Sequence, residues 1–329
     1  YGGVRRARVS SQSWKKAIRD YFNANSEQTN VGVRTLNIVE YVAGKIQAID
    51  SSINFEDSLK LANDVINKAG VTTKDYKAKA LFFLGETQGK ELAQAAIDGI
   101  SDKKILENIL RNNPAIDIAL FGRMVADDPS LNEDASCQVA HAISTHAIQS
   151  EFDFFTAVDD LAPEDNAGAG MLGTVEYNSS TLYRYANVAI HSLLRQLNSK
   201  QATIDSLKLF IESFSNSMPT GKINTFANQT LPQAILISLR NDRPVSLVSA
   251  FEEPVKSTEG YVEKSVIKLF KEYERVQKFV NEPLFTAYLI LNENGLSIEL
   301  EGETINLSTL LDEFREKLEE LLPNTEGEL

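Results

Sequence analysis

Two strand-like segments separated by a turn-rich stretch limit most strongly how this chain can fold. Residues 152–158 and 172–177 are rich in aromatic and β-branched side chains, whereas residues 159–170 between them are mostly Asp, Ala and Gly. This pattern is typical of a β-hairpin. Strand signals continue over residues 181–188, so we expect a long protruding β-ribbon within a chain whose other segments are mainly helical.

Helical periodicity dominates the first third of the chain. Apolar residues recur at helical spacing over about residues 11–24, and Ser10 or Ser11 is suited to cap the N-terminus of that helix. The first turn of a helix offers free N–H groups and the positive end of the helix dipole to an anion. Residues 33–112 contain several further helical segments without a fixed repeat period, which predicts a helical insertion and no solenoid.

The remaining segments alternate between the two kinds of structure. Residues 115–121 are apolar and predict a strand in a sheet core, and the Ala-rich residues 137–148 predict a helix. This order predicts a mixed α+β fold on a split β-α-β core, with a first strand missing before Tyr1. Further helices are expected over residues 199–215, 262–279 and 307–322, and further strands over residues 234–239, 285–291 and 296–300.

Charge is distributed unevenly along the chain. The 329 residues include 33 Lys or Arg and 46 Asp or Glu, and the net charge of −13 disfavours a protein covered with nucleic-acid-binding cations. Residues 1–19, however, hold six of the cations and no acid, a local charge of +6 that leaves −19 for all other residues. Two interpretations stay open, a solvated charged face or a strip that contacts phosphates.

Cysteine and histidine are scarce. The single Cys excludes an intrachain disulfide and favours a reducing compartment, so we expect a cytoplasmic protein. No apolar run approaches the roughly 20 residues of a membrane span. His141 and His146 are spaced so that one helix face cannot hold both, although Cys137 could pair with His141 as a nucleophile. We expect packing roles for these residues, no catalytic residue, no metal and no cofactor.

Several sequence blocks occur in an order that is specific to one known family. The first is residues 2–19, which read Gly-Gly-Val-Arg-Arg-Ala-Arg-Val-Ser-Ser-Gln-Ser-Trp-Lys-Lys-Ala-Ile-Arg. The others cover residues 117–124, 140–146, 153–161, 172–174 and 182–187. Together these blocks resemble the CasC-type backbone subunit of the type I-E CRISPR Cascade surveillance complex, over at least residues 1–260.

The resemblance implies an α+β fold with the shape of a hand. Its palm would be a modified RNA-recognition (ferredoxin-like) fold whose first strand is absent from this chain. Its fingers would be a helical insertion and its thumb a protruding β-hairpin. The palm would comprise residues 1–30, 113–150 and 189–329, the fingers residues 31–112, and the thumb residues 151–188.

The resemblance also implies a function in antiviral defence. Members of that family bind CRISPR RNA without cutting it, stack head to tail with further copies of themselves, and present the guide for pairing with target DNA beside other Cascade subunits. A protein that binds any guide sequence should contact phosphate and ribose. By position in the motifs, the guide contacts would be Arg5, Arg6, Arg8, Ser10, Gln12, Lys15, Lys16, Arg19, Arg123, Met124 and Lys222.

The expected thumb needs a different argument. Residues 151–183 contain seven acids and no Lys or Arg, so charge would not draw this hairpin to RNA. We expect it to act by shape, with Leu161, Met171 and Leu172 as an apolar wedge. Two rival interpretations are a helical scaffold that does not bind RNA and a metal-dependent RNA endonuclease that would use Asp127, Asp128, Asp159 or Asp160.

Overall fold

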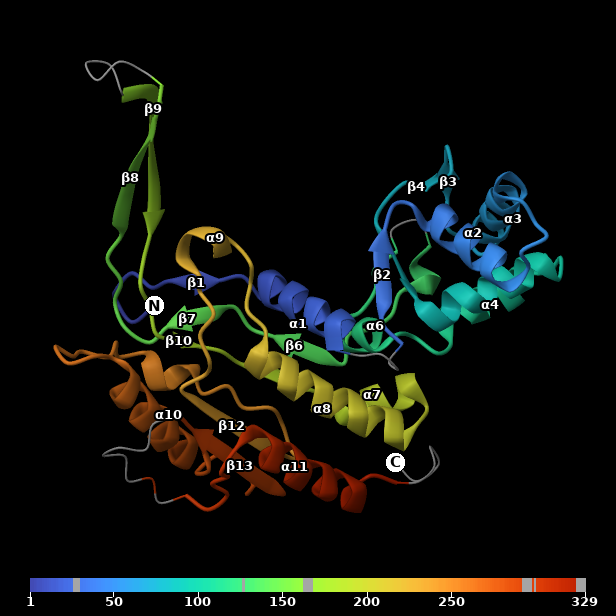
Figure 1. The fold of residues 1–329 in the computed structure, drawn as a ribbon. Coiled ribbons are helices and arrows are strands. Elements are labelled where there is room, and N and C mark those ends of the chain that lie inside the picture. Colours follow the sequence, from blue (N-terminus) through green and yellow to red (C-terminus); the bar gives the residue numbers. More distant parts are fainter. Residues whose placement is uncertain (26–29, 126–127, 162–167, 292–297, 299, 324–329) are drawn as a thin grey trace. The chain divides into compact units, whose positions relative to one another are not determined.

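The computed structural model describes the chain except residues 26–29, 126–127, 162–167, 292–297, 299 and 324–329 (Figure 1). The chain forms two compact units, each built from three separate segments. Unit 1 comprises residues 1–11, 140–185 and 233–303, and unit 2 comprises residues 12–139, 186–232 and 304–329. Both units contain helices and small sheets, which confirms the predicted α+β class.

Unit 2 contains most of the helices. Helix α1 (Ser11–Asn25) confirms the first predicted helix and buries Trp14, Ile18 and Phe22. In the predicted helical insertion, α2 (Ile38–Ile49), α3 (Phe55–Lys68), α4 (Glu86–Ile97) and α5 (Lys103–Arg111) share one apolar core. The other helices of this unit are α6 (Ile116–Phe121), η1 (Pro129–Leu131), α7 (Ile190–Leu197), α8 (Lys200–Asn216), α9 (Ile223–Phe226) and α11 (Leu307–Leu321).

Local capping explains where several of these helices begin. An N-cap side chain that accepts a hydrogen bond from a first-turn N–H satisfies a donor that the helix itself leaves unpaired. Helices α3, α5, α8 and α11 start in this way, at Asn54, Asp102, Ser199 and Asn306.

Unit 2 also holds three small antiparallel pairs of strands. Strand β2 (Gly32–Thr35) pairs with β5 (Phe82–Gly85), and β6 (Cys137–Val139) pairs with β11 (Ala186–Val188). Strands β3 (Thr73–Lys74) and β4 (Lys77–Ala78) form a short hairpin beside α3.

The predicted core strand over residues 115–121 is wrong, because this segment is helix α6. Every residue from Ile116 to Leu120 is buried, so no polar face gives the segment a period by which a helix could be told from a strand. The aromatic ring of Phe121 lies between those of Phe22 and Phe210, each with a centroid separation of 6.4 Å. Helix α6 thus belongs to the core of unit 2 beside α1 and α8.

The predicted helix over residues 137–148 is also wrong. The segment contains β6 and, in unit 1, β7 (Ala142–Ser144). Strand β7 is the centre of a three-stranded antiparallel sheet between β1 (Arg8–Val9) and β10 (Leu182–Tyr183). Pairing on both edges outweighs the modest helix preference of the alanines. The strand expected over residues 181–188 is divided between β10 and β11.

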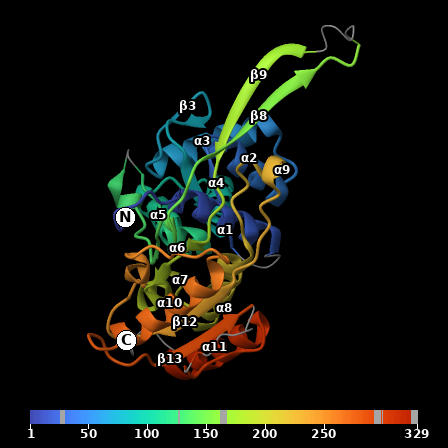
Figure 2. The ribbon, with the colours of Figure 1, turned by 90° about the vertical axis from the view of Figure 1, so that its left-hand side faces the viewer.

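A long hairpin projects from this three-stranded sheet (Figure 1), and Figure 2 shows the same hairpin from another side. It consists of β8 (Glu151–Val158) and β9 (Gly168–Tyr177), which confirms the two strand segments predicted there. Of the expected turn, residues 162–167 lie outside the described residues, whereas Gly168 to Gly170 already belong to β9.

The rest of unit 1 is a two-stranded sheet covered by a helix. Strands β12 (Ala234–Leu239) and β13 (Phe285–Ile290) pair antiparallel, and α10 (Val262–Val276) packs Val266 and Phe270 against Tyr288 of β13. The 3-10 helix η3 (Val248–Phe251) lies beside α10. The predictions for these segments are confirmed, while the strand expected over residues 296–300 lies largely outside the described residues.

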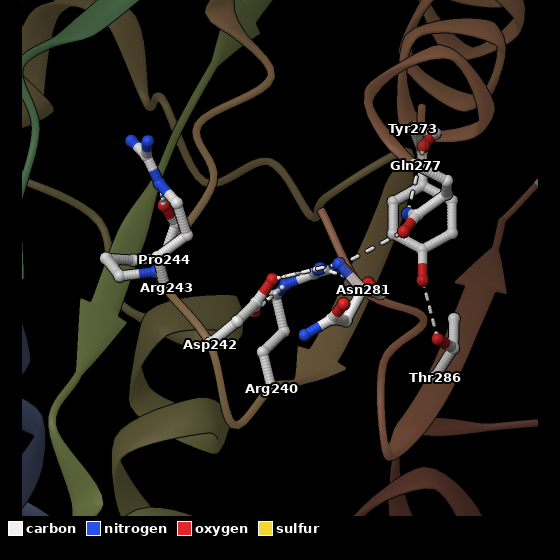
Figure 3. A network of polar contacts seen from close by, with 8 residues as sticks. All are labelled: Arg240, Asp242, Arg243, Pro244, Tyr273, Gln277, Asn281 and Thr286. Carbon is white, nitrogen blue, oxygen red and sulfur yellow. Dashed lines mark hydrogen bonds and ion pairs between the residues drawn. The ribbon is translucent and has the colours of Figure 1, made fainter. Parts of the chain in front are cut away.

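A polar network fixes the loop that follows β12 (Figure 3). Arg240 forms a two-pronged ion pair with Asp242, with Nε–Oδ1 and Nη2–Oδ2 distances of 2.9 and 3.1 Å, and also donates to the carbonyl of Asn281. The Arg240 guanidinium holds the pKa of Asp242 well below its ordinary value. Arg243 is exposed and points away from this network.

The described sheets contain two or three strands each. The RNA-recognition-type palm and the division into palm, fingers and thumb therefore stay predictions.

Candidate nucleic-acid interface

The three arginines that open the chain differ in what they contact within unit 1. Arg5 and Arg8 are exposed, and neither forms an ion pair with a described residue. Arg6 is half-buried and donates from Nη1 to the carbonyl of Ser144 at 2.7 Å and from Nη2 to that of Phe251 at 2.6 Å. Burial lowers the pKa of Arg6. Arg6 therefore holds the fold together, whereas Arg5 and Arg8 present free guanidinium groups.

The predicted contacts around the start of α1 also divide into two groups. Ser10 directly precedes the helix and is half-buried, and Gln12 in its first turn is exposed. Lys16 is exposed and forms an ion pair with Asp20 one turn later. Lys15 is half-buried, with its Nζ 5.5 Å from the ring centroid of Phe121. Gln12 and Lys16 are thus the more accessible of these side chains.

Arg19 occupies an interior site of unit 2. Its Nε lies 2.8 Å from Oδ2 of Asp117, whose side chain is fully buried, and its guanidinium lies 4.3 Å from the ring centroid of Phe83. The other carboxylate oxygen of Asp117 accepts the N–H of Gly32 at 2.8 Å. Burial raises the pKa of Asp117, and the Arg19 cation opposes that rise. Arg19 therefore neutralises a buried acid within unit 2.

Arg123 is an interior residue as well, although the motif suggested a guide contact. It is 4 % exposed and donates to the carbonyls of Leu110 at 2.6 Å, Leu131 at 3.0 Å and Phe83 at 3.3 Å. Burial lowers its pKa to about 10. The guanidinium thus joins separate segments of unit 2 and cannot reach a phosphate.

Two other predicted contacts lie at the surface of unit 2. Met124 is 82 % exposed, so this predicted guide contact is accessible. Lys222 is exposed and adopts a φ of +56° directly before α9, a helix of four residues.

The β8–β9 hairpin exposes apolar side chains rather than cations. Leu161, Leu172 and Met171 are 95 %, 77 % and 59 % exposed, which makes all three predicted wedge residues accessible. The register places Thr156 opposite Leu172 and Phe154 opposite Thr174, so the exposed Phe154 shares a face with Leu172. This face is an apolar surface without a partner among the described residues of unit 1.

Two of the acids that a nuclease would need accept hydrogen bonds from nearby backbone N–H groups. Asp128 accepts the N–H of Ser130, and Asp159 accepts that of Leu161. Asp127 lies outside the described residues. Over the part of the chain that is described, no three His, Cys, Asp or Glu side chains gather as a metal site would require.

Cys137 and His146 are buried, whereas His141 is exposed, so the packing role expected for His141 is not seen. Burial raises the pKa of the Cys137 thiol to about 12, which opposes formation of a nucleophilic thiolate. The ring of His146 stacks on that of Tyr261 at 3.7 Å, and its Nε2 accepts the N–H of Thr181. His146 thus helps to hold the base of the β8–β9 hairpin.

One basic surface of unit 2 was not predicted from the sequence. The β3–β4 hairpin exposes Lys74, Lys77 and Lys79 around Tyr76. Three lysines and a tyrosine within six residues could have indicated this surface, but they lie within residues 33–112, where the sequence pattern led us to expect helices.

Comparisons with known proteins show that this chain is similar to chains of solved surveillance complexes. A chain of a solved "CRISPR RNA-guided surveillance complex, pre-nicking" matches 97 % of this chain and 92 % of its own length, with 28 % identity and a TM-score of 0.84. A chain of a second "CRISPR RNA-guided surveillance complex" matches 96 % of this chain and 91 % of its own length, with a TM-score of 0.73. At 24 % identity, that second match shows the fold alone. No curated protein matches this chain.

Among the described residues, no helix is both long and apolar enough to cross a membrane.

The chain also matches a protein family over most of its sequence. The model of the CT1975-like proteins matches residues 1–316, so this chain belongs to the CT1975-like protein family.

Proposed function

We propose that this chain is a backbone subunit of a CRISPR surveillance complex and that it binds the ribose-phosphate backbone of the guide RNA. The observation that carries the proposal is the match of 97 % of the chain, at 28 % identity and a TM-score of 0.84, to a chain of an RNA-guided surveillance complex. The match covers both units, so it concerns the whole architecture and not one shared domain.

The surface chemistry supports contact with phosphates. Arg5 and Arg8 have no ion-pair partner among the described residues, and Lys16 pairs only with an exposed carboxylate. Met124, Gln12 and Lys222 are also accessible. Cations and amides of this kind contact phosphate and ribose without reading base edges, which suits a protein that must hold guides of any sequence.

The β8–β9 hairpin supports assembly of several copies along the guide. It exposes Phe154, Leu161 and Leu172 on an acidic ribbon, and exposed apolar surface of this extent commonly marks an interaction site. In the proposed assembly, these side chains contact the neighbouring copy and the bases at its edge. The assembled guide then pairs with target DNA beside other subunits. The type I-E assignment stays a prediction from the sequence motifs.

We further propose that the subunit does not cut nucleic acid. The rival nuclease would use Asp127, Asp128, Asp159 or Asp160 with a metal ion, and Asp128 and Asp159 each accept a local backbone N–H. A scaffold that does not touch RNA would leave Arg5 and Arg8, the exposed cations of the N-terminal arm (residues 1–9), without a ligand.

Co-purification tests guide binding. The chain is expressed with its guide RNA, and retained RNA is sequenced and titrated against salt. We expect retention of guide RNA and a steep negative slope of log affinity against log salt concentration. Cleavage of the RNA on addition of magnesium would favour the nuclease, and absence of retained RNA would favour the scaffold.

Alanine substitution of the wedge tests assembly. We expect Leu161→Ala, Met171→Ala and Leu172→Ala together to leave the folded unit intact, because all three side chains are exposed. Multiple copies should then fail to order along the guide, and chemical probing should show loss of any periodic base accessibility. An unchanged probing pattern would contradict the proposed role of the hairpin.

A further inference from the structure

The short β3–β4 hairpin of unit 2 is held firmly at the surface beside α3. The N–H of Ala78 donates to the carbonyl of Leu36 at 2.9 Å, and Ala78 itself is buried in the core of the helical segment. The hydroxyl of Thr73 lies 2.6 Å from both the Asn63 and Asn67 side chains of α3. Figures 1 and 2 show the hairpin beside α3. These anchors fix the direction in which the hairpin tip points.

The hairpin surface carries positive charge that the fold does not neutralise. Lys74, Lys77 and Lys79 are exposed, as is Arg34 on β2, and none of them forms an ion pair with a described residue. Five other lysines of the same predicted helical segment do have carboxylate partners, namely Lys45, Lys60, Lys68, Lys90 and Lys103. Lys104 of the same segment is also exposed without an ion-pair partner among the described residues, so what distinguishes the hairpin is that three such lysines lie within six residues that contain one acid, Asp75.

The residue at the tip points to the kind of anion. Asp75 and Tyr76 form the two-residue turn with φ values of +51° and +59°, a conformation that favours Asn-Gly and strains a bulky side chain. The Tyr76 side chain is nevertheless 44 % exposed between the lysines. Strained residues of this kind concentrate at binding sites, where the function of the side chain offsets the cost to folding.

We propose that the β3–β4 hairpin binds a single-stranded segment of nucleic acid, with one base stacked on the Tyr76 ring and adjacent phosphates held by Lys74, Lys77 and Lys79. An aromatic ring flanked by cations suits a single strand, because only an unpaired base can offer its face for stacking. A duplex would use the lysines but would leave the ring without a partner. The proposal does not rest on guide binding by the N-terminal arm.

The decisive variant is Tyr76→Gly in the full chain. Glycine adopts a positive φ readily, so the turn is kept and urea unfolding should show no loss of stability. The affinity for a fluorescent thymidine oligonucleotide of about 15 nucleotides, measured by anisotropy, should fall about 5- to 100-fold, as expected for loss of one stacked base. Tyr76→Phe should retain most of that affinity.

The lysines are tested by salt dependence. The triple variant Lys74→Gln, Lys77→Gln and Lys79→Gln should make the slope of log affinity against log salt shallower by about 0.7 for each phosphate that the variant no longer binds. The control Lys90→Gln, Lys103→Gln and Lys104→Gln changes net charge equally on exposed lysines of α4 and α5 and should leave the slope nearly unchanged.

Two results with Tyr76→Gly, and a third with the arginines, would overturn the proposal. One is unchanged oligonucleotide affinity in Tyr76→Gly. The other is equally tight binding of a duplex with the same loss on Tyr76→Gly, since a duplex offers no base for the ring. If the variant Arg5→Gln, Arg8→Gln alone abolishes binding, the hairpin proposal fails while the proposed guide function stands.

Discussion

The N-terminal arm of unit 1 and the α1–α6 region of unit 2 (residues 12–125) both contain arginines that the family motifs placed among the guide contacts. In the arm, Arg5 and Arg8 are exposed and have no acidic partner among the described residues. In the α1–α6 region, Arg19 pairs with a buried aspartate and Arg123 donates to buried carbonyls. All four residues are arginines and their motifs belong to one family, but their surroundings differ. Arg5 and Arg8 are available to a ligand, whereas Arg19 and Arg123 stabilise the fold.

This difference shows how to separate structural cations from cations available to a ligand. A guanidinium that is buried with several acceptors stabilises the fold, because removing it leaves those acceptors unsatisfied. An exposed guanidinium without a partner contributes little to stability and stays available to an anion. Substitutions in the two regions should therefore affect different measurements.

The largest effect on stability is expected for Arg123→Met. The substitution leaves the carbonyls of Leu110, Leu131 and Phe83 without this donor in a buried site, so we expect the free energy of unfolding to fall by about 4 kcal/mol. Urea unfolding followed by circular dichroism measures this change. Arg8→Met is the matched control at an exposed site, and an equal loss in both variants would contradict the distinction.

A smaller loss, about 3 kcal/mol, is expected for Arg19→Gln, because Asp117 then stays buried without a cation. Arg19 opposes the rise in the pKa of Asp117, so its removal raises that pKa further above the unfolded value. A raised folded-state pKa destabilises the fold as the pH increases. The loss should therefore be larger at about pH 7 than at about pH 4.5.

A double-mutant cycle checks that interpretation. Asp117→Asn removes the buried charge, so Arg19→Gln should be less destabilising in that background than in the natural chain. Additive losses would mean that the two side chains stabilise the fold independently.

The next effect concerns RNA affinity and not stability. Arg5→Gln and Arg8→Gln together should weaken guide binding about fivefold to tenfold and make the salt slope shallower by about 0.7 for each phosphate that is no longer bound. The unfolding midpoint should stay unchanged, because neither side chain has an ion-pair partner among the described residues. A large loss of stability with unchanged RNA affinity would reverse the assignment of the arm.

The smallest effect is expected at Asp242, which forms an ion pair with Arg240 in the loop after β12 of unit 1. Because Arg240 lowers the pKa of Asp242, this carboxylate stabilises the fold above its unfolded pKa and loses that contribution as the pH falls. The difference in unfolding midpoint between the natural chain and Asp242→Asn should be small at neutral pH. It should narrow below about pH 4, and a constant difference would contradict the ion-pair origin.

Sequence periodicity predicted elements with one polar face better than fully buried ones. Helices α1, α8, α10 and α11 were predicted because their apolar residues recur along one face, and the β8–β9 hairpin was predicted from its aromatic and β-branched residues on either side of a turn-rich stretch. Helix α6 and strand β7 were assigned the wrong type because every residue of β7 and five residues of α6 are buried. Without a polar face, neither segment carries the period that separates a helix from a strand.

The sequence by itself determined the α+β class, the main helices and strands, the resemblance to CRISPR backbone subunits and the concentration of cations in the first 19 residues. Only the tertiary structure decided which cations face outward. Arg6, Arg19 and Arg123 find their acceptors on Ser144, Asp117 and Leu110, residues that folding brings close from elsewhere in the chain. The availability of a charge depends on burial and on such partners, and local sequence does not encode these contacts.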